Sequence, residues 1–340
     1  MKAMRLEVQS PAELEPLQLK NLPKPNPGPG QLRLRVRACG VCRTDLHTIE
    51  GDIQPPSLPI TPGHQVVAIV DALGEEAEAR WQIGDRVGVP WLHQACRECE
   101  YCLRGEENLC PLARFTGFHV NGGFAEYMLA RSDYVMPLPA NLPDHQMAPL
   151  LCAGIVGYRS LRKSDLAPGE RLGLFGFGAS AHLAIQVAHH WGCEVYVFTR
   201  AEIHRQHARD LGAAWVGGAE ESVPHLLDRA VIFAPAGYLV PHALEKVRPA
   251  GTVAINAIHT SPIPKMPYSI LYGERTLRSV AHATYQDGLE FLSLAAKIPV
   301  RASVQTYPLE EAGRALLDLK NSRINGEAVL DISIPPIRPV

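Results

Sequence analysis

The pattern of hydrophobic and polar positions changes near Leu150 and divides the chain into two kinds of structure. Before that point, short segments with alternating or apolar side chains are separated by turns rich in proline and glycine, a pattern that predicts strands. The predicted strands are RLEV, QLRLRVRAC, HQVVAIVDAL, DRVGVP and FAEYMLA. This part of the chain is therefore expected to form an irregular, mostly β domain.

After Leu150, short continuous apolar segments alternate with amphipathic ones. RLGLFGFG precedes ASAHLAIQVAHHWG, EVYVFT precedes AEIHRQHARDLGA, and RAVIFAP precedes LVPHALEKV. Strands that alternate with helices are typical of an α/β fold with a parallel sheet. A closing helix, LEEAGRALLDLK, and strand, EAVLDISI, resemble the first part. We therefore expect one domain of residues 1–152 and 289–340, a second domain of residues 153–288 inserted into it, and an active site in the cleft between them.

Composition and charge exclude several classes of function. The 340 residues are 46% hydrophobic and 20% charged with a net charge of −2, so nucleic acid and membrane are not expected partners. The N-terminus lacks the apolar core of a signal peptide, and no apolar run approaches the roughly 20 residues that span a bilayer. A cytoplasmic location is therefore expected. Eight cysteines without an export signal, four of them in one loop, favour metal over disulfides.

The four clustered cysteines of QACRECEYCLRGEENLCP follow the spacing C-x2-C-x2-C-x7-C. They are Cys96, Cys99, Cys102 and Cys110. Four thiolates on one compact loop can surround a zinc ion and leave no open position, which is the arrangement of a structural site. An iron–sulfur cluster on the same thiolates is a competing interpretation, and four unrelated buried cysteines are another.

A second candidate ligand set is spread along the sequence. Cys42 lies in ACGVCRTDLH, His64 in GHQ and Cys152 in PLLCAGIVGY. One imidazole and two thiolates leave the fourth zinc position open for water or substrate, as catalysis requires. Taken alone, His64 could equally be a core histidine bonded to a carbonyl, and Cys152 a small buried residue.

The order of these features resembles the zinc-containing medium-chain alcohol dehydrogenases over nearly the whole chain. It runs Cys42-Arg-Thr-Asp-x-x-His, Gly-His64, the four-cysteine loop, Cys152 and a glycine-rich turn. The resemblance implies a GroES-like catalytic domain, a Rossmann-type doubly wound domain and two zinc ions per chain. It also implies a catalytic zinc on Cys42, His64 and Cys152, with Asp45 orienting His64 through its other ring nitrogen.

The same resemblance assigns a proton relay and one cofactor contact. Thr44 takes the proton of the alcohol and passes it through the nicotinamide ribose to His47, and so to water. The alternative for Thr44 is a hydroxyl bonded to nearby backbone. Arg43 matches a position that reaches the cofactor pyrophosphate.

The resemblance also places Ile53 and Trp91 against the substrate. A bulky indole narrows the space near zinc, so small primary alcohols and aldehydes, aliphatic or cinnamyl-type aromatic, are the expected substrates. Polyols are not expected, because polyol dehydrogenases more often carry a glutamate where this chain has Cys152. The alternative for Trp91 is an indole in the domain core.

A glycine-rich turn follows an apolar strand and opens a helix. Gly176, Gly178 and Ala181 fit G-x-G-x-x-[G/A], in which the first glycine permits a tight turn and the second lets the backbone approach a pyrophosphate. The small Ala181 lets the helix lie close to the strand. This context predicts a bound nicotinamide dinucleotide, with its pyrophosphate at the helix N-terminus.

The end of the next strand predicts which dinucleotide is preferred. The carboxylate that would bind a ribose hydroxyl is missing, and Thr199 and Arg200 stand there instead, with Arg205 nearby. These residues would suit a 2′-phosphate, so NADP is preferred, NAD stays possible, and aldehyde reduction is the expected direction. Alternatively, Arg200 lies over the adenine or points into water.

Two positions depart from the family pattern. Family members commonly follow the zinc-binding histidine with glutamate, whereas this chain has Gln65, which predicts a more electropositive site and a lower pKa for zinc-bound water or alcohol. Many relatives carry a phosphate-binding arginine where this chain has Glu327. That contact is expected to be absent or replaced by Arg323.

Two other functions compete with an alcohol dehydrogenase. A quinone or enone reductase on the same fold would lack zinc, and a zinc-stabilised binding module would use the four-cysteine loop to bind nucleic acid or protein. Neither would need the complete second ligand set together with the glycine-rich turn. The resemblance further implies a homodimer or homotetramer joined through edge strands of the dinucleotide-binding sheet.

Overall fold

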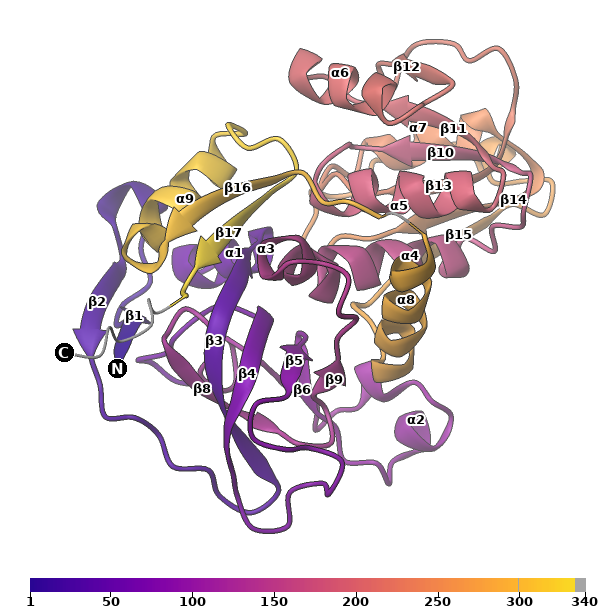
Figure 1. The fold of residues 1–340 in the computed structure, drawn as a ribbon. Coiled ribbons are helices and arrows are strands. Elements are labelled where there is room, and N and C mark those ends of the chain that lie inside the picture. Colours follow the sequence, from indigo (N-terminus) through magenta and orange to yellow (C-terminus); the bar gives the residue numbers. More distant parts are fainter. Residues whose placement is uncertain (299, 334–340) are drawn as a thin grey trace. The chain divides into compact units, whose positions relative to one another are not determined.

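The computed structural model describes residues 1–298 and 300–333 (Figure 1). The described residues divide into two compact units, of which the first comprises Met1–Cys152, Thr284–Ser293 and Ala302–Ser333. The second comprises Ala153–Ala283 and Leu294–Arg301. The predicted return at residue 289 falls inside helix α8 (Tyr285–Lys297), and both units share this helix.

The first unit is built on a mostly antiparallel sheet with the strand order β16-β17-β3-β4-β5-β9, and β8 also pairs with β3. Its strands are β3 (Gln31–Val41), β4 (Gln65–Leu73), β5 (Arg86–Val89), β8 (Tyr127–Arg131), β9 (Met136–Pro137), β16 (Val304–Pro308) and β17 (Glu327–Asp331). Figure 1 shows β17, near the C-terminus, beside β3, and the two strands pair antiparallel. The end of the chain therefore completes the sheet that its beginning starts.

Alternation of side chains along β3 explains the core of this unit. Leu32, Leu34 and Val36 are fully buried, and the residues between them are only partly covered. They pack with Val66 and Val70 of β4 in one hydrophobic cluster. Removing such side chains from water is the main stabilising contribution, about 1.5–3 kcal/mol for each large aliphatic side chain.

Short elements surround the first sheet. They are the paired strands β1 (Lys2–Leu6) and β2 (Leu17–Asn21), the paired strands β6 (Leu92–Gln94) and β7 (Arg114–Phe115), and the helices α1 (Arg43–Glu50), α2 (Glu100–Leu103), α3 (Asp144–Met147) and α9 (Ala312–Lys320). Neither β6 nor β7 was expected from the sequence, because strands of two or three residues are too short to show a period. They matter because they flank the four-cysteine loop.

The second unit contains a parallel sheet with the order β12-β11-β10-β13-β14-β15. Its strands are β10 (Arg171–Phe175), β11 (Glu194–Phe198), β12 (Trp215–Gly217), β13 (Leu227–Ile232), β14 (Val247–Ile255) and β15 (Thr276–Ser279), and its helices are α4 (Ala153–Lys163), α5 (Ala179–His190), α6 (Glu202–Asp210) and α7 (Leu239–Lys246). Four successive residues of β10 are buried, so both faces of the sheet are covered, as the continuous apolar pattern predicted. The predicted α/β architecture is confirmed.

No helix in residues 1–298 and 300–333 is both long and apolar enough to cross a membrane.

Candidate functional site

Three predicted metal ligands converge in the first unit. The ligand atoms of Cys42, His64 and Cys152 lie within 4.8 Å of one another, and Cys42 Sγ is 3.2 Å from His64 Nε2. Cys42 caps α1 directly after β3, and His64 immediately precedes β4, the strand that pairs with β3. Cys152 follows a short 3₁₀ turn. Two thiols and one imidazole at this separation fit a zinc ion with one open position.

Asp45 holds two of these ligands in place. Its carboxylate accepts hydrogen bonds from the Cys42 amide and the Gly63 amide, each at 3.0 Å, and lies 3.1 Å from His64 Nδ1. Gly63 has φ of +96°, and a side chain there would collide with the Phe124 ring. The backbone before His64 therefore requires glycine. One buried carboxylate orients the imidazole so that its other nitrogen faces the thiols.

The three ligand groups shift one another's pKa values. A hydrogen bond with Cys152 and the nearby His64 hold the pKa of Cys42 well below its ordinary value, against the effect of burial. The same hydrogen bond and burial raise the pKa of Cys152 well above its ordinary value. Burial opposes a charge on His64, but Asp45 and Cys42 outweigh it and raise its pKa. A divalent cation would replace the protons that these groups share.

The two predicted relay residues lie one turn apart on α1. His47 Nδ1 is 2.7 Å from Asp52 Oδ2, an acceptor not anticipated from the sequence. The helix ends at Gly51 with φ of +91°, and this turn brings Asp52 back to the helix. The Ile53 amide also returns, donating to the His47 carbonyl at 3.3 Å. The relay role of Thr44 and His47 and the substrate role of Ile53 stay predictions.

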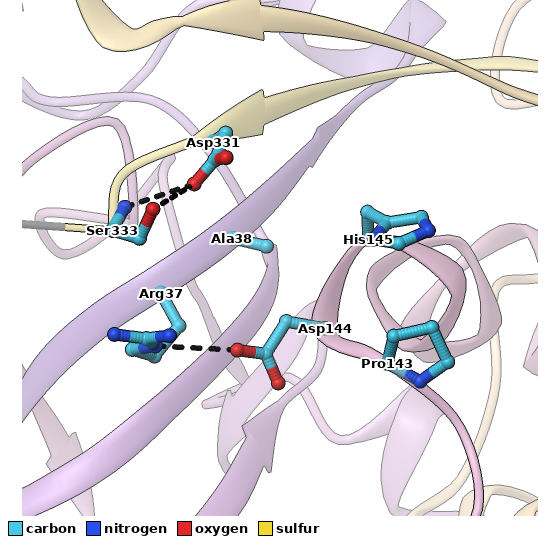
Figure 2. A pocket seen from close by; sticks show the side chains of 7 residues that line it. All are labelled: Arg37, Ala38, Pro143, Asp144, His145, Asp331 and Ser333. Atoms are coloured by element: carbon cyan, nitrogen blue, oxygen red, sulfur yellow. Dashed lines mark hydrogen bonds and ion pairs between the residues drawn. The ribbon is translucent and has the colours of Figure 1, made fainter.

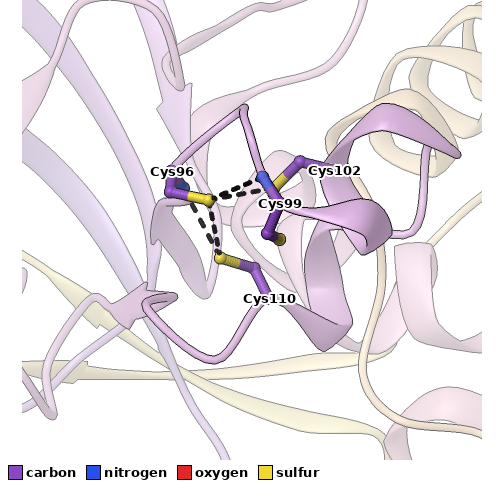
Figure 3. A group of neighbouring side chains, drawn as sticks. All are labelled: Cys96, Cys99, Cys102 and Cys110. Atoms are coloured by element: carbon purple, nitrogen blue, oxygen red, sulfur yellow. Dashed lines mark hydrogen bonds between the residues drawn. The ribbon is translucent and has the colours of Figure 1, made fainter.

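The four-cysteine loop closes on itself (Figure 3). Cys96 Sγ lies 3.8 Å from Cys102 Sγ and 3.5 Å from Cys110 Sγ, and all four side chains meet at one point of the loop. Zn–S bonds of about 2.3 Å in a tetrahedron give S···S edges of about 3.8 Å. All eight cysteines are free thiols. The loop thus fits one tetrahedral metal and contains no disulfide.

The glycine-rich turn of the second unit has the geometry that its motif requires. Gly176 has φ of +90°, and a Cβ there would lie 2.8 Å from the Ala234 amide nitrogen, so glycine is needed on both counts. Gly178 caps α5 and has open space where a side chain would be. Ala181 is fully buried. The first turn of α5 therefore presents free backbone amides next to a glycine with no side chain, which suits a pyrophosphate.

Comparisons with known proteins agree with this geometry. The model described as "Alcohol dehydrogenase GroES-like domain" matches residues 28–140, and the one described as "Zinc-binding dehydrogenase" matches residues 181–297. "Probable alcohol dehydrogenase AdhA" of Mycobacterium tuberculosis (strain CDC 1551 / Oshkosh) is 44% identical over 335 residues, covering 97% of each chain. The chain belongs to the zinc-type medium-chain alcohol dehydrogenases.

Two further relatives support the assignment. An alcohol dehydrogenase of Geobacillus stearothermophilus is 35% identical over 325 residues, which cover 93% of this chain and 96% of the relative. The solved structure of a cinnamyl alcohol dehydrogenase from Sorghum bicolor superposes with a TM-score of 0.89 at 25% identity and covers 99% of both chains. The predicted family, the Rossmann-type and GroES-like domains, and the class of alcohol oxidoreductase are confirmed.

Aromatic rings line one side of the metal-ligand trio in this alcohol dehydrogenase. Trp91 meets the His64 ring edge-on, with centroids 4.8 Å apart, and stacks on Phe115 with centroids 5.0 Å apart and planes inclined by 9°. Phe118 lies 5.9 Å from Trp91. Trp91 is partly exposed, and its role against the substrate stays a prediction. Phe115 and Phe118 were not predicted, although the FTGF segment just after Cys110 was a visible signal.

The two departures from the family pattern turn out to be partners. Gln65 Nε2 donates a hydrogen bond to Glu327 Oε1, and both residues are buried. Burial and the charge of Cys42 raise the pKa of Glu327 well above its ordinary value. The more electropositive site expected from Gln65 stays a prediction, and β17 brings the carboxyl group of Glu327 next to that residue. Arg323 is exposed and lies 3.5 Å from Asp318.

The predicted phosphate partners of this dehydrogenase differ in their surroundings. Thr199 is buried, and its carbonyl accepts a hydrogen bond from Arg205 Nε at 3.0 Å. Arg205 also lies 3.5 Å from Glu221, which accepts a hydrogen bond from the Gly218 amide at 2.7 Å. Arg200 is exposed and forms no ion pair with any residue that the structure describes. Glu221 was not predicted, because it lies in the loop after β12, far along the sequence from Thr199 and Arg200.

A surface pocket of the first unit lies apart from the predicted site residues (Figure 2). Its central feature is Asp144, which accepts hydrogen bonds from Arg37 Nε at 3.2 Å and Arg86 Nε at 2.8 Å. Figure 2 shows Asp331 on the opposite wall, bonded to Ser333. These contacts tie α3 to β3 and β5, so the pocket's polar groups are occupied in holding the fold together.

Proposed function

We propose that this alcohol dehydrogenase is zinc-dependent and transfers hydride reversibly between a nicotinamide dinucleotide and a small primary alcohol or aldehyde, aliphatic or aromatic. The observation that carries the proposal is the convergence of Cys42, His64 and Cys152 with Asp45 bonded to His64. These three ligands would hold the zinc, which when bound would polarise the oxygen of the substrate. The nicotinamide, as the redox partner, would accept or return the hydride.

The protein's own groups would manage the proton. The Thr44 hydroxyl would accept the proton of the alcohol, since Thr44 stands two residues after Cys42 and its amide donates to Cys42 Sγ at 3.3 Å. His47, one turn along the same helix, would pass the proton to solvent. Asp52, 2.7 Å from His47 Nδ1, would hold the imidazole ring in the orientation that this transfer needs. Arg43, exposed at the start of the helix, would bind the pyrophosphate of the cofactor.

A second zinc would occupy Cys96, Cys99, Cys102 and Cys110 and leave no position for substrate. Metal analysis of the purified chain tests both sites, and the expected result is about two zinc ions per chain. Iron in place of one zinc would identify the loop as a cluster site. A chain that carries no metal and still reduces quinones would overturn the proposal in favour of the zinc-free reductase.

NADP is the cofactor that the second unit favours. Arg200 is exposed two residues after β11 and has no ion-pair partner among the described residues, and Arg205 Nε donates a hydrogen bond to the carbonyl of the preceding Thr199. A guanidinium in this position would bind a 2′-phosphate. Glu221 forms an ion pair with Arg205 and would repel the same phosphate. Arg200 is therefore the main candidate to bind the 2′-phosphate. Comparing kcat/KM for NADPH and NADH tests this, and a strong preference for NADH would overturn it.

The stacked rings favour planar substrates. Trp91 meets the His64 ring edge-on and stacks on Phe115, and these two partly exposed side chains provide an aromatic surface beside His64. An aromatic aldehyde can stack on such a surface, which is worth about 0.5–1.5 kcal/mol beyond its buried area. We therefore expect cinnamyl- and benzyl-type substrates to have lower KM values than aliphatic ones of equal length. A substrate panel run with both cofactors tests this order.

A homo-oligomer would cover the exposed apolar groups of the second unit. β15 is an edge strand of the parallel sheet, and the segment before it exposes Ile258, Tyr268 and Tyr272. An unpaired strand edge beside exposed rings is the kind of surface that pairs with a second copy. Sedimentation of the intact chain tests this, and a monomer at micromolar concentration would overturn it.

A further inference from the structure

Two polar side chains of this enzyme are completely buried next to the metal-ligand trio. Gln65 directly follows His64, and its exposed fraction is 0%. Glu327 has an exposed fraction of 1% and opens β17, one residue before the pair Ala328–Val41 in the ladder with β3. This register puts Glu327 opposite Cys42. Gln65 and Glu327 are joined by a hydrogen bond from Gln65 Nε2 to Glu327 Oε1.

Each member of the pair keeps a second acceptor without a partner. Gln65 Oε1 and Glu327 Oε2 are buried and accept no hydrogen bond. Leaving such atoms unpaired costs about 1–3 kcal/mol each, and more for a charged group. In the described part of the chain, no lysine or arginine forms an ion pair with Glu327. A nearby positive charge would stabilise the ionised form of such a buried carboxyl group.

A third residue, a glycine, leaves the space that the hydrogen-bonded pair of Gln65 and Glu327 occupies. Gly40 of β3 pairs with Gln65 across the ladder, and a Cβ on Gly40 would lie 2.9 Å from both Gln65 Cδ and Nε2. Any other residue at 40 would push the amide away from Glu327. Three neighbouring strands therefore contribute to one arrangement. The electrostatic influence of Glu327 extends to the thiols of Cys42 and Cys152.

We infer that Glu327 is the charge-balancing residue of the catalytic metal in this enzyme, with Gln65 as the amide that holds it in position. The inference rests on the proposed function, since it requires a metal on Cys42, His64 and Cys152. A bound metal would supply a divalent positive charge beside Glu327. In return, the carboxylate strengthens the hold of the trio on the cation through their mutual attraction. Glu327 touches neither substrate nor cofactor and acts through the metal.

The exchange of two side chains gives a direct test. Glu327→Gln removes the carboxylate at constant size, whereas the double variant Gln65→Glu with Glu327→Gln keeps one carboxylate and one amide in the same space. Asp331→Asn, an exposed carboxylate on the same strand, is the matched control. The readout is the rate at which the chelator 4-(2-pyridylazo)resorcinol removes metal. Cobalt-substituted enzyme separates the two sites, because a two-thiolate and a four-thiolate site absorb differently.

We expect Glu327→Gln to release the metal of the trio about tenfold faster or more, as for other residues that support metal ligands. The double variant should return to within a few-fold of the unaltered enzyme, and Asp331→Asn should not differ from it. Release from the four-cysteine loop should be unchanged in all three. Melting temperatures of the metal-free forms show whether any effect comes from the fold instead.

An unchanged release rate in Glu327→Gln would overturn the inference, as would a double variant that releases metal as fast as the single one. If Glu327→Gln does not fold, the double variant decides alone. If the double variant retains the metal of the trio, the inference stands. If the double variant releases that metal rapidly, the inference is wrong. A wild-type chain that holds no metal on the trio would instead overturn the proposed function, so the two failures are distinguishable.

Discussion

The indole of Trp91, the residue two positions after β5, stacks on the ring of Phe115 in β7, and β6 and β7 form a ribbon that leads to the four-cysteine loop. Phe115 pairs with Leu92 in the β6–β7 ladder, and the Thr116 amide donates to the Trp91 carbonyl at 2.9 Å. The same two strands run on to Cys96 and Cys110. A ribbon this short has few hydrogen bonds of its own, so the loop and the ring stack stabilise its two ends.

Loss of metal from the loop should therefore disturb the stack. We expect Cys99→Ser to weaken the near-ultraviolet circular dichroism of the aromatic rings and to raise KM for aromatic aldehydes about three- to tenfold, the range that one lost stacking contact gives. The trio should keep its own metal. Cys193→Ser, which alters a buried thiol of the second unit, is the control. An undisturbed spectrum in the metal-depleted variant would show that the ribbon holds without the loop.

Asp45→Asn tests the support of His64. The variant keeps the size of the side chain but loses the charge that faces His64 Nδ1 at 3.1 Å. Because this charge orients the ring and increases its basicity, we expect metal affinity at the trio to fall about 10- to 100-fold. Competition with a calibrated chelator measures it. Affinity within a factor of two of the unaltered enzyme would contradict the assigned role of Asp45.

His47→Gln tests the proton relay. If His47 carries the proton from Thr44 to solvent, its loss should lower kcat for alcohol oxidation about 100-fold near neutral pH, within the usual range for general acid–base catalysis. The loss should shrink at high pH, where hydroxide takes the proton directly, and added imidazole should restore part of the rate. KM should change little. A pH-independent loss without rescue by imidazole would indicate a structural role.

Arg200→Ala tests cofactor choice. A hydrogen bond to a charged group contributes about 1.5–3 kcal/mol, so kcat/KM for NADPH should fall roughly 10- to 100-fold, whereas NADH should be almost unaffected. Glu221→Gln should act in the opposite direction, because it removes a negative charge 3.5 Å from Arg205. Equal losses for both cofactors in Arg200→Ala would mean that the guanidinium contacts a part they share, such as the adenine.

Acid should destabilise the second unit through His182. Burial and the neighbouring His207 lower the pKa of His182 to about 4, from an ordinary value of 6.5. Between these two values the unfolded chain binds a proton that the folded chain does not, so stability is full above about pH 6.5 and falls as the pH falls toward 4.

His182→Leu removes this contribution. Between pH 7 and pH 5 the unaltered chain should lose roughly 2 kcal/mol more stability than the variant, measured by urea unfolding of the second unit. His190→Leu, an exposed position on the same helix, should behave like the unaltered chain. Parallel losses in the unaltered chain and His182→Leu would place the acid sensitivity elsewhere.

Features that depend only on residues close together in the sequence could be predicted from the sequence. The alternation in β3, the apolar run in β10 and the turn at Gly176 each reflect a local steric or burial requirement, and the structure contains all three. The four-cysteine loop belongs to the same class, because its ligands lie within fifteen residues and the spacing alone brings them together. Elements of two or three residues, such as β6 and β7, could not be predicted, since so short a segment shows no period.

Only the tertiary structure determined which side chains from distant segments of the chain come into contact. The sequence pointed to Cys42, His64 and Cys152 through a family resemblance, but the pairing of β3 with β4 and the turn before Cys152 bring their ligand atoms within 4.8 Å. Gln65 and Glu327 looked like two independent departures, and a strand register makes them partners. Register between strands depends on the packing of whole faces, so no local pattern reveals which side chains will meet.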